Sequence, residues 1–219
     1  MTATHAPTAT GTRDDRRASS QATGSLGSRI APRRGPAVAE EIVEAASRLF
    51  ATHGIRAVSA DRILAEVGFS KVTFYRHFPS KDDVVVAYLE RELARVRAAI
   101  AQGTGVPPDL TTIAAALTED MCGPGFRGCP FINAAAEYPD AEHPVRRVVA
   151  DFRAVMMRAI EGWLVSAGVA RDGADTALLA HQIMMLRDGA LVAGYLDRDP
   201  DAVTRGLANA MGTLLGGRP

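Results

Sequence analysis

Two short segments of helical periodicity, joined by a glycine turn, constrain the fold of this chain more than any other feature. The first begins after Ser59, a good N-cap residue, carries an apolar stripe at helical spacing and stops at Gly68. The turn reads Gly-Phe-Ser, in which glycine accepts a positive φ at little cost and Ser70 can cap the next helix. Two helices joined in this way predict a helix-turn-helix unit.

The second of these helices has an apolar back and a basic front. Phe74 and Phe78 lie four residues apart, so they share one face of the helix. Lys71 and Arg76 cannot both follow them inward, and Pro79 ends the helix because proline disfavours the α conformation in the preceding residue. In a helix-turn-helix unit this helix lies in the major groove, where cations and hydroxyls contact phosphates and base edges. We therefore expect it to bind DNA.

Another helix is expected before this unit and completes a DNA-binding domain. It begins at Pro36, because proline suits the first helical position, and it ends near Gly54, because glycine suits the position after the last. The apolar residues between them recur at helical spacing. We assign residues 36–82 to a three-helix DNA-binding domain.

The net charge of zero conceals a difference between the two parts of the chain. Residues 1–81 hold 12 Lys and Arg against 7 Asp and Glu, whereas residues 82–219 hold 13 against 18. A positive N-terminal part favours a polyanionic partner, and double-stranded DNA is such a partner.

Residues 1–35 are expected to form a disordered basic tail. Thr, Ala, Ser, Gly and Arg dominate this segment, which has no apolar periodicity. Two interpretations stay open: the tail is solvated without contacts, or it reaches DNA beside the folded domain through Arg29, Arg33 and Arg34.

The remainder of the chain shows helical periodicity, and we find no convincing strand. Aromatic residues make up only 5% of the chain, so Ala, Val, Leu and Met must fill much of the core. Ser80 can cap a helix together with Asp83. Further helices are expected over residues 81–100, 109–121, 131–138, 144–167, 172–196 and 201–215. The predicted fold class is all-α, with a C-terminal helical domain over residues 83–219.

The segment VSADRILAEVGFSKVTFYRHFPSKDDVVVAYL, residues 58–89, resembles the DNA-binding signature of the TetR family of bacterial repressors. The shared pattern is a capped helix, a Gly turn, Ser-Lys, Thr-aromatic-Tyr-x-His-Phe, and a Lys that starts the fourth helix. The resemblance covers about residues 36–90, and the remainder is similar only in architecture. It implies a homodimer that holds an operator until a small-molecule effector enters the C-terminal core.

The resemblance also implies roles for individual residues. Lys71, Val72 and Thr73 are expected to contact base edges. The residues expected to contact the phosphate backbone are Ser59, Tyr75, Arg76, His77 and Lys81. The alternatives are a core position for Tyr75, a solvated position for Lys81 and a packing role for His77. The predicted DNA-binding set is Ser59, Arg62, Ser70, Lys71, Val72, Thr73, Tyr75, Arg76, His77 and Lys81.

Two of these residues depart from the family pattern. Val72 stands where Gly is common, which narrows the approach to DNA and permits a methyl contact with thymine. Arg62 stands where an acid is common, and it either adds a phosphate contact or pairs with Asp61 or Glu66.

The C-terminal domain holds candidates for an effector site. Met suits adaptable apolar surfaces, and buried polar side chains can orient a ligand. An ordinary core is the alternative, because periodicity does not separate a cavity from a core. The predicted ligand-binding set is Phe131, Asn133, Glu137, Met156, Trp163, His181, Met184 and Met185.

Two C-terminal helices are expected to form the dimer interface. The helix over residues 172–196 is apolar on nearly every side, so it must be buried between partners. Two helices from each subunit would form a four-helix interface. The predicted interface set is Leu178, Met185, Val192, Val203, Leu207, Met211 and Leu214.

A redox-sensing regulator is the rival prediction, because Cys122 and Cys129 flank a loop rich in Gly and Pro. Inert thiols are the alternative, since disulfides are rare in the cytosol. The acids beside His143 are interpreted as a polar turn between two prolines, so no metal is expected. We also expect no cofactor, no enzyme activity, no membrane partner and a cytoplasmic location, because the corresponding motifs are missing.

Overall fold

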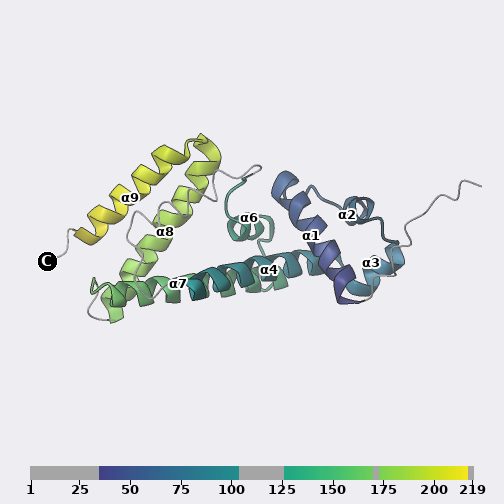
Figure 1. Cartoon of the computed structure of the whole chain (residues 1–219), viewed down its shortest axis with the longest axis horizontal. Helices are drawn as coiled ribbons and strands as arrows, with labels where there is room; N and C mark the ends of the chain where they lie inside the picture. The colour runs from purple at the N-terminus through teal and green to yellow at the C-terminus, as the bar shows by residue number, and fades with distance from the viewer. Residues whose placement is uncertain (1–34, 104–125, 170–172, 217–219) are drawn as a thin grey trace, which may run out of the picture. The chain divides into compact units, whose positions relative to one another are not determined.

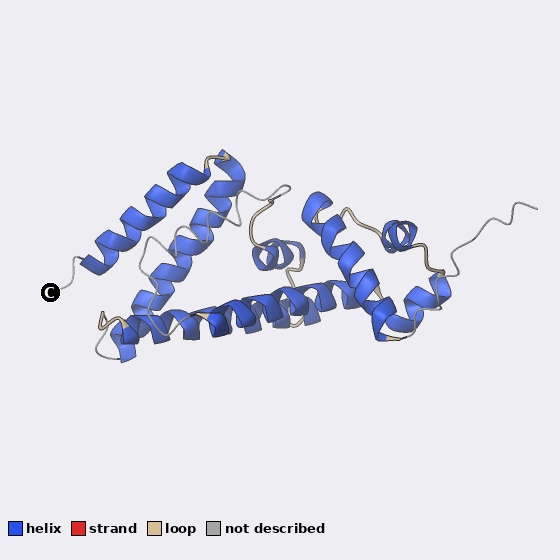
Figure 2. Cartoon of the chain, viewed as in Figure 1, coloured by secondary structure: helices blue, strands red, loops and turns tan. Residues whose placement is uncertain are grey.

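The computed structural model describes residues 35–103, 126–169 and 173–216, and every regular element within these ranges is an α-helix (Figures 1 and 2). The predicted all-α fold is confirmed for this part of the chain. The basic tail, the helix expected over residues 109–121 and Cys122 lie outside the described residues. The helices are α1 Pro36–His53, α2 Ala60–Val67, α3 Lys71–His77, α4 Lys81–Gln102, α6 Pro130–Glu137, α7 Pro144–Ser166, α8 Gly173–Asp197 and α9 Pro200–Gly216.

The capping residues predicted from the sequence begin the helices as expected. The Ser59 hydroxyl accepts a hydrogen bond from the Arg62 N–H at 3.2 Å and so caps α2. At the start of α4, Ser80 and Asp83 form a capping box, in which each side chain accepts from the other residue's backbone N–H. These caps satisfy N–H groups that have no partner inside the helix.

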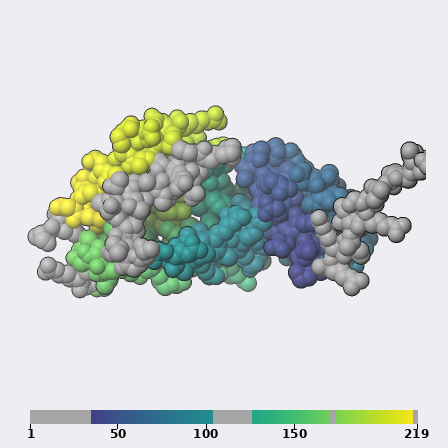
Figure 3. Space-filling model, in the orientation of Figure 1, coloured from purple at the N-terminus to yellow at the C-terminus, as the bar shows by residue number. Residues whose placement is uncertain are grey.

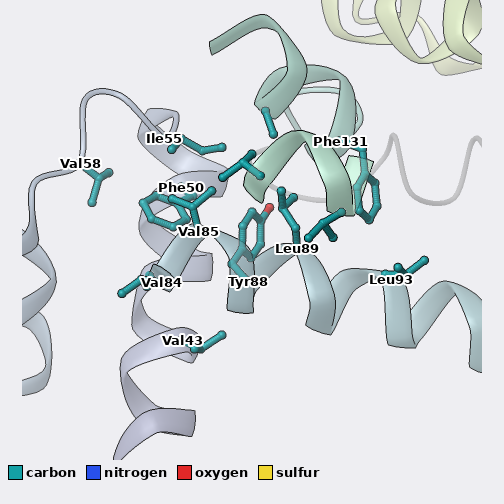
Figure 4. Close-up of a cluster of buried hydrophobic side chains, with 14 of the residues drawn as sticks. Val43, Phe50, Ile55, Val58, Val84, Val85, Tyr88, Leu89, Leu93 and Phe131 are labelled. Carbon is teal, nitrogen blue, oxygen red and sulfur yellow. The ribbon is translucent and has the colours of Figure 1, made fainter. Parts of the chain in front are cut away.

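A hydrophobic cluster joins the N-terminal helices to α4, α6 and α7. Ile42 of α1, Ile63 of α2 and Phe74 of α3 are all fully buried in it. Figure 4 shows Phe50, Tyr88 and other side chains of this cluster between α1 and α4. Helix α4 therefore belongs to both parts of the described chain, and the domain boundary after residue 82 stays a prediction.

A second cluster lies between the end of α7, α8 and α9. Leu164, Leu179 and Ala180 are fully buried in it, and Leu207 and Met211 of α9 pack into the same cluster. The yellow-green and yellow segments that contain α8 and α9 lie next to one another in the space-filling view (Figure 3). The chain thus covers one face of α8 with its own α9, and no partner is needed for that face.

We expect Phe74→Ala to destabilise the folded chain far more than Val72→Ala. Phe74 is fully buried, so truncation leaves a cavity and lowers the free energy of unfolding by about 3–5 kcal/mol. Val72 lies on the same helix but is 77% exposed, so its truncation changes that free energy by about 0.5 kcal/mol or less. Urea unfolding of both variants and the parent measures the difference. Equal losses would contradict the orientation of α3.

Candidate nucleic-acid interface and ligand cavity

Helix α3 presents one buried face and one exposed face, as the sequence predicts. Phe74 and Phe78 are buried, and their rings lie 6.3 Å apart between centroids. The side chains of Val72 and Tyr75 are exposed, and the Tyr75 and Phe74 rings pack in a T-shaped arrangement. Lys71 and Arg76 are also exposed, whereas Thr73 and His77 are half-buried. The polar and cationic groups of α3 are therefore directed away from its packing surface.

The turn between α2 and α3 has the geometry that its glycine permits. Gly68 adopts φ 73° and ψ 13°, the left-handed conformation, and its N–H donates to the Leu64 carbonyl at 2.9 Å. Ser70 then caps α3 by accepting from the Thr73 N–H at 3.1 Å. The two hydroxyls of Ser70 and Thr73 lie 2.9 Å apart, so a base contact by Thr73 would draw on a hydroxyl that already has a partner.

Lys71 at the start of α3 forms an ion pair with Asp61 of α2. The distance from Nζ to the carboxylate is 2.8 Å, and both side chains are about two-thirds exposed. The hydrogen bond and the charge of Asp61 raise the pKa of Lys71 above its usual value. Asp61 uses one of the three ammonium donors and offsets the charge of Lys71, so it would weaken the attraction of Lys71 for a phosphate or base.

Arg62 does not pair with either of the two acids considered from the sequence. Its guanidinium lies 2.7 Å from the Nε2 atom of His53, at the end of α1. Asp61 pairs with Lys71 instead, and Glu66 lies 3.6 Å from Arg48. The prediction of an Arg62 pair with Asp61 or Glu66 is wrong, because His53 supplies the nearer partner. A phosphate contact by Arg62 stays a prediction.

Lys81 has a structural partner that sequence reasoning missed. Its ammonium donates to the carbonyls of Ile55 at 3.0 Å and Val58 at 3.2 Å, both in the loop between α1 and α2. The side chain is half-buried there, so the alternative of a purely solvated lysine is wrong. An ammonium has three donors, and the two carbonyls use two of them. The expected phosphate contact of Lys81 stays a prediction.

A cavity of about 860 Å³ lies between α1, α4, α6 and α8. Phe131, Asn133 and Glu137 from the predicted ligand-binding set line it. Phe131 also lines a second cavity of about 650 Å³ between α6, α7 and α8. Both volumes fall within the range typical of small-molecule sites. The sequence contained no signal for the lining residues of α1, because the cavity depends on how α1 packs beside α6.

The other predicted ligand-binding residues line neither of these two cavities. Met184 is fully buried in the first hydrophobic cluster, and Met156 is half-buried beside the same cluster. Trp163 is half-buried beside the second cluster. His181 and Met185 are exposed on α8. Their roles in ligand binding stay predictions, and the geometry of these two cavities gives them no support.

The predicted interface residues fall into two groups. Leu178, Met185 and Val192 are exposed on α8, as an interface requires. By contrast, Leu207 and Met211 are buried against α8 of the same chain. The apolar stripe of α9 faces inward, because α8 offers it an apolar surface within the chain. Those two residues therefore expose almost no area to a second copy, and Val203 and Leu214 are half-buried beside them.

Cys129 is buried, and Cys122 lies outside the described residues, so the predicted redox pair is untested. Within the described ranges, no cluster of His, Cys, Asp and Glu has the size of a metal site. None of the described helices combines the length and the hydropathy that crossing a membrane requires.

A helix-turn-helix domain followed by a helical domain with a cavity defines a class of DNA-binding transcriptional regulators, and comparisons with known proteins agree. The family model of the bacterial regulatory proteins, tetR family, matches residues 42–88. The model of the tetracyclin repressor-like C-terminal domain matches residues 108–210. The crystal structure of SCO4454, a TetR-family transcriptional regulator from Streptomyces coelicolor, is similar with a TM-score of 0.72 and 35% identity, over 81% of this chain and 94% of that chain.

The chain belongs to the TetR family of transcriptional regulators. A TetR transcriptional regulator from Chloroflexus aurantiacus shares the fold, with a TM-score of 0.68 and 24% identity over 83% of this chain and 96% of its own. The uncharacterized HTH-type transcriptional regulator Rv1255c of Mycobacterium tuberculosis is 33% identical over 67 residues, which cover 31% of this chain and 33% of that regulator. The match therefore spans about a third of the length of that relative.

We expect Asp61→Asn to tighten binding to duplex DNA. The substitution removes the carboxylate that pairs with Lys71 in the free protein. An exposed ion pair of this kind stabilises the free protein by up to about 1 kcal/mol, so its loss is expected to raise the affinity for DNA about fivefold or less. Glu66→Gln is the matched control, because Glu66 is on the same helix and pairs with Arg48 instead. Fluorescence anisotropy with labelled DNA measures both. A gain no greater than that of the control would contradict competition at Lys71.

We expect Lys81→Ala to lower the free energy of unfolding as well as the affinity for DNA. The substitution leaves two loop carbonyls without their charged donor, at a cost of about 1–3 kcal/mol. Lys71→Ala is the control, because Lys71 is exposed and bonds only to an exposed carboxylate. Urea unfolding separates the two lysines. An unchanged stability in Lys81→Ala would show that the loop does not depend on this ammonium.

Proposed function

We propose that this chain represses transcription as a homodimer that binds a palindromic operator and is released by a small-molecule effector. The observation that carries the proposal is the exposed polar face of α3 on a helix whose apolar face is buried. Its partners are double-stranded DNA, a second copy of the chain and the effector. No metal or cofactor takes part. The protein acts in the cytoplasm, with the DNA that it regulates.

The exposed surface of α8 supports the homodimer. Leu178, Met185, Val192 and Leu196 recur at spacings of seven and four residues, so they share one face of the helix, and each is 44% exposed or more. Apolar side chains of this size favour burial against a partner. A two-fold axis through two such faces would bring two copies of α3 to two half-sites of a palindrome.

The contacts of Glu137 support release by an effector. Glu137 lines the larger cavity, and its Oε1 atom accepts a hydrogen bond from the Ile55 N–H at 3.2 Å. Its carbonyl also accepts from Arg56 at 3.3 Å. The same loop is held by Lys81, the first residue of α4. A ligand that changes the position of Glu137 therefore acts directly on the loop between α1 and α2 of the DNA-binding domain.

A second contact between the domains supports the same coupling. The Tyr138 hydroxyl donates to Asp82 at 2.7 Å, and the His143 ring lies 3.3 Å from the other oxygen of that carboxylate. Burial and the Asp82 carboxylate raise the pKa of Tyr138, so this phenol keeps its proton at physiological pH. The loop between α6 and α7 is thereby bonded to the first turn of α4.

Selection of binding sites from a random pool of duplex DNA tests the proposed function. Two recognition helices related by a two-fold axis are expected to select an inverted repeat with half-sites about 34–36 Å apart, one turn of DNA. A matched protein with Tyr75→Ala and Arg76→Ala on α3 controls for nonspecific retention. Recovery of random sequences by the parent, or recovery of the same repeat by the control, would contradict the proposal.

We expect Met185→Glu to prevent dimerisation without unfolding the chain. Met185 is 57% exposed in the single chain, so a charge is tolerated there, but two-fold symmetry would bury two like charges in the interface. Ile100→Glu is the control, because Ile100 is an exposed apolar residue near the end of α4. Sedimentation velocity at micromolar concentration measures the mass. The parent and the control are expected near twice 23.2 kDa, and the variant near 23.2 kDa.

A parent protein that sediments as a monomer would contradict the homodimer. A Met185→Glu variant that remains dimeric would instead place the interface on another surface. Circular dichroism of the variant checks that it retains its helices.

A further inference from the structure

Two polar side-chain atoms of the described residues are buried without a hydrogen-bond partner, and both belong to residues that line the larger cavity. They are Nε of Arg91, on α4, and Oε2 of Glu137, the last residue of α6. Buried polar atoms normally have partners, because an unsatisfied donor or acceptor costs free energy. One of these atoms needs an acceptor and the other needs a donor.

The Arg91 guanidinium is held in place by its other end. Its Nη1 atom forms an ion pair with Glu44 of α1, and the hydrogen bond and charge of Arg91 lower the pKa of Glu44. Glu44 is therefore ionised, and its carboxylate fixes the position of the guanidinium. The Nε–H of Arg91 is then a charged donor that suits a carboxylate oxygen, because charge-assisted hydrogen bonds of arginine are strong.

Glu137 is also held by one of its two oxygens. The Ile55 N–H donates a hydrogen bond to Oε1 of Glu137, and the Arg56 guanidinium donates to the backbone carbonyl of Glu137. The carboxylate is thus anchored to the loop between α1 and α2, while Oε2 accepts nothing. A hydroxyl group on a ligand is the simplest donor for this oxygen.

The rest of the lining favours a ligand with an aromatic body. Phe131 and Phe152 are stacked with centroids 3.9 Å apart, and Phe50, Tyr88 and Leu191 also line the cavity. Five arginines and three glutamates are among the residues that line the cavity. Acids outside the lining pair with two of these arginines, Glu66 with Arg48 and Asp188 with Arg187, so the preference for an anion depends on the Nε–H of Arg91.

We propose that this cavity binds an aromatic carboxylic acid that also carries a hydroxyl group, with the carboxylate on Arg91 and the hydroxyl on Glu137. The inference rests on the proposed function in one respect, namely that this ligand is the effector. A hydroxyl bound to Oε2 places the ligand on the same carboxylate that accepts from the Ile55 N–H through Oε1, so occupancy changes the position of the group that joins α6 to the loop of the DNA-binding domain.

Three compounds of similar shape distinguish the contribution of the ligand's carboxylate from that of its hydroxyl group. The probe 4-hydroxycinnamate carries both, cinnamate lacks the hydroxyl, and 4-hydroxycinnamyl alcohol lacks the carboxylate. Isothermal titration of the full chain without DNA measures the three dissociation constants. The hydroxy acid is expected to bind about tenfold or more tightly than either analogue, because each analogue leaves one buried atom unsatisfied.

Two variants test the assignment of each group to its residue. Glu137→Gln replaces the free acceptor by an amide and is expected to abolish the preference for the hydroxyl, with cinnamate bound as in the parent. Arg91→Lys removes Nε and is expected to abolish the preference for the carboxylate. Glu90→Gln and Arg97→Lys are the controls, because both residues are exposed on α4 and line neither cavity.

Failure of this inference is distinguishable from failure of the proposed function. If no compound binds, if the three bind equally, or if both variants keep the parent's preferences, the inference is overturned. Operator selection by the ligand-free protein is an independent result, so a chain that selects an operator but ignores these compounds keeps the proposed function. A chain that shows the expected preferences but selects no DNA keeps the ligand class and loses the regulator.

Discussion

The loop between α1 and α2 is held from two sides, and the arrangement of the DNA-binding helices depends on it. Lys81 of α4 donates to the carbonyls of Ile55 and Val58, and Glu137 of α6 accepts from the Ile55 N–H. Backbone groups in a part-buried loop need such partners, because no helix or sheet supplies them. The loop precedes α2, and α2 leads through its glycine turn to α3. A displacement of Glu137 therefore reaches the recognition helix through a short chain of bonded groups.

This arrangement gives α4 two roles. Its first turn bonds to the loop and, through Asp82, to Tyr138 after α6. Its apolar residues pack against α1 on one side and α6 and α7 on the other, as Tyr88 and Leu89 do in Figure 4. Closely packed protein cores transmit displacements rather than absorbing them. The cavity lies against the same helix, so under the proposed function a bound molecule would contact residues of α4 and α6 that also pack against the DNA-binding helices.

Sequence reasoning predicted the parts of the structure that depend on local chemistry. The caps of Ser59, Ser70 and Ser80, the turn at Gly68 and the buried face of α3 follow from residue type and spacing, and the structure has them. Periodicity also predicted the stripe of α9, but it does not say which surface covers a stripe. Leu207 and Met211 therefore pack on α8 of their own chain, although an interface was expected there.

The contacts that sequence reasoning missed join residues far apart in the chain. Nothing near Glu137 in the sequence indicates Ile55, which lies 82 positions earlier, and nothing near Lys81 indicates two loop carbonyls. Likewise, Asp61 is recognised as a partner of Lys71 only when α2 and α3 are packed together. Such pairs depend on tertiary geometry and leave no periodic signal.

Amide hydrogen exchange at Ile55, followed by NMR, tests the link between the cavity and the DNA-binding domain most directly. The account predicts that Glu137→Ala speeds exchange of the Ile55 amide, because this N–H loses its acceptor, while the amide of buried Ile63 in α2 keeps its parental rate. An Ile55 amide that exchanges at the parental rate in Glu137→Ala would contradict the account, because Glu137 would then not hold the loop.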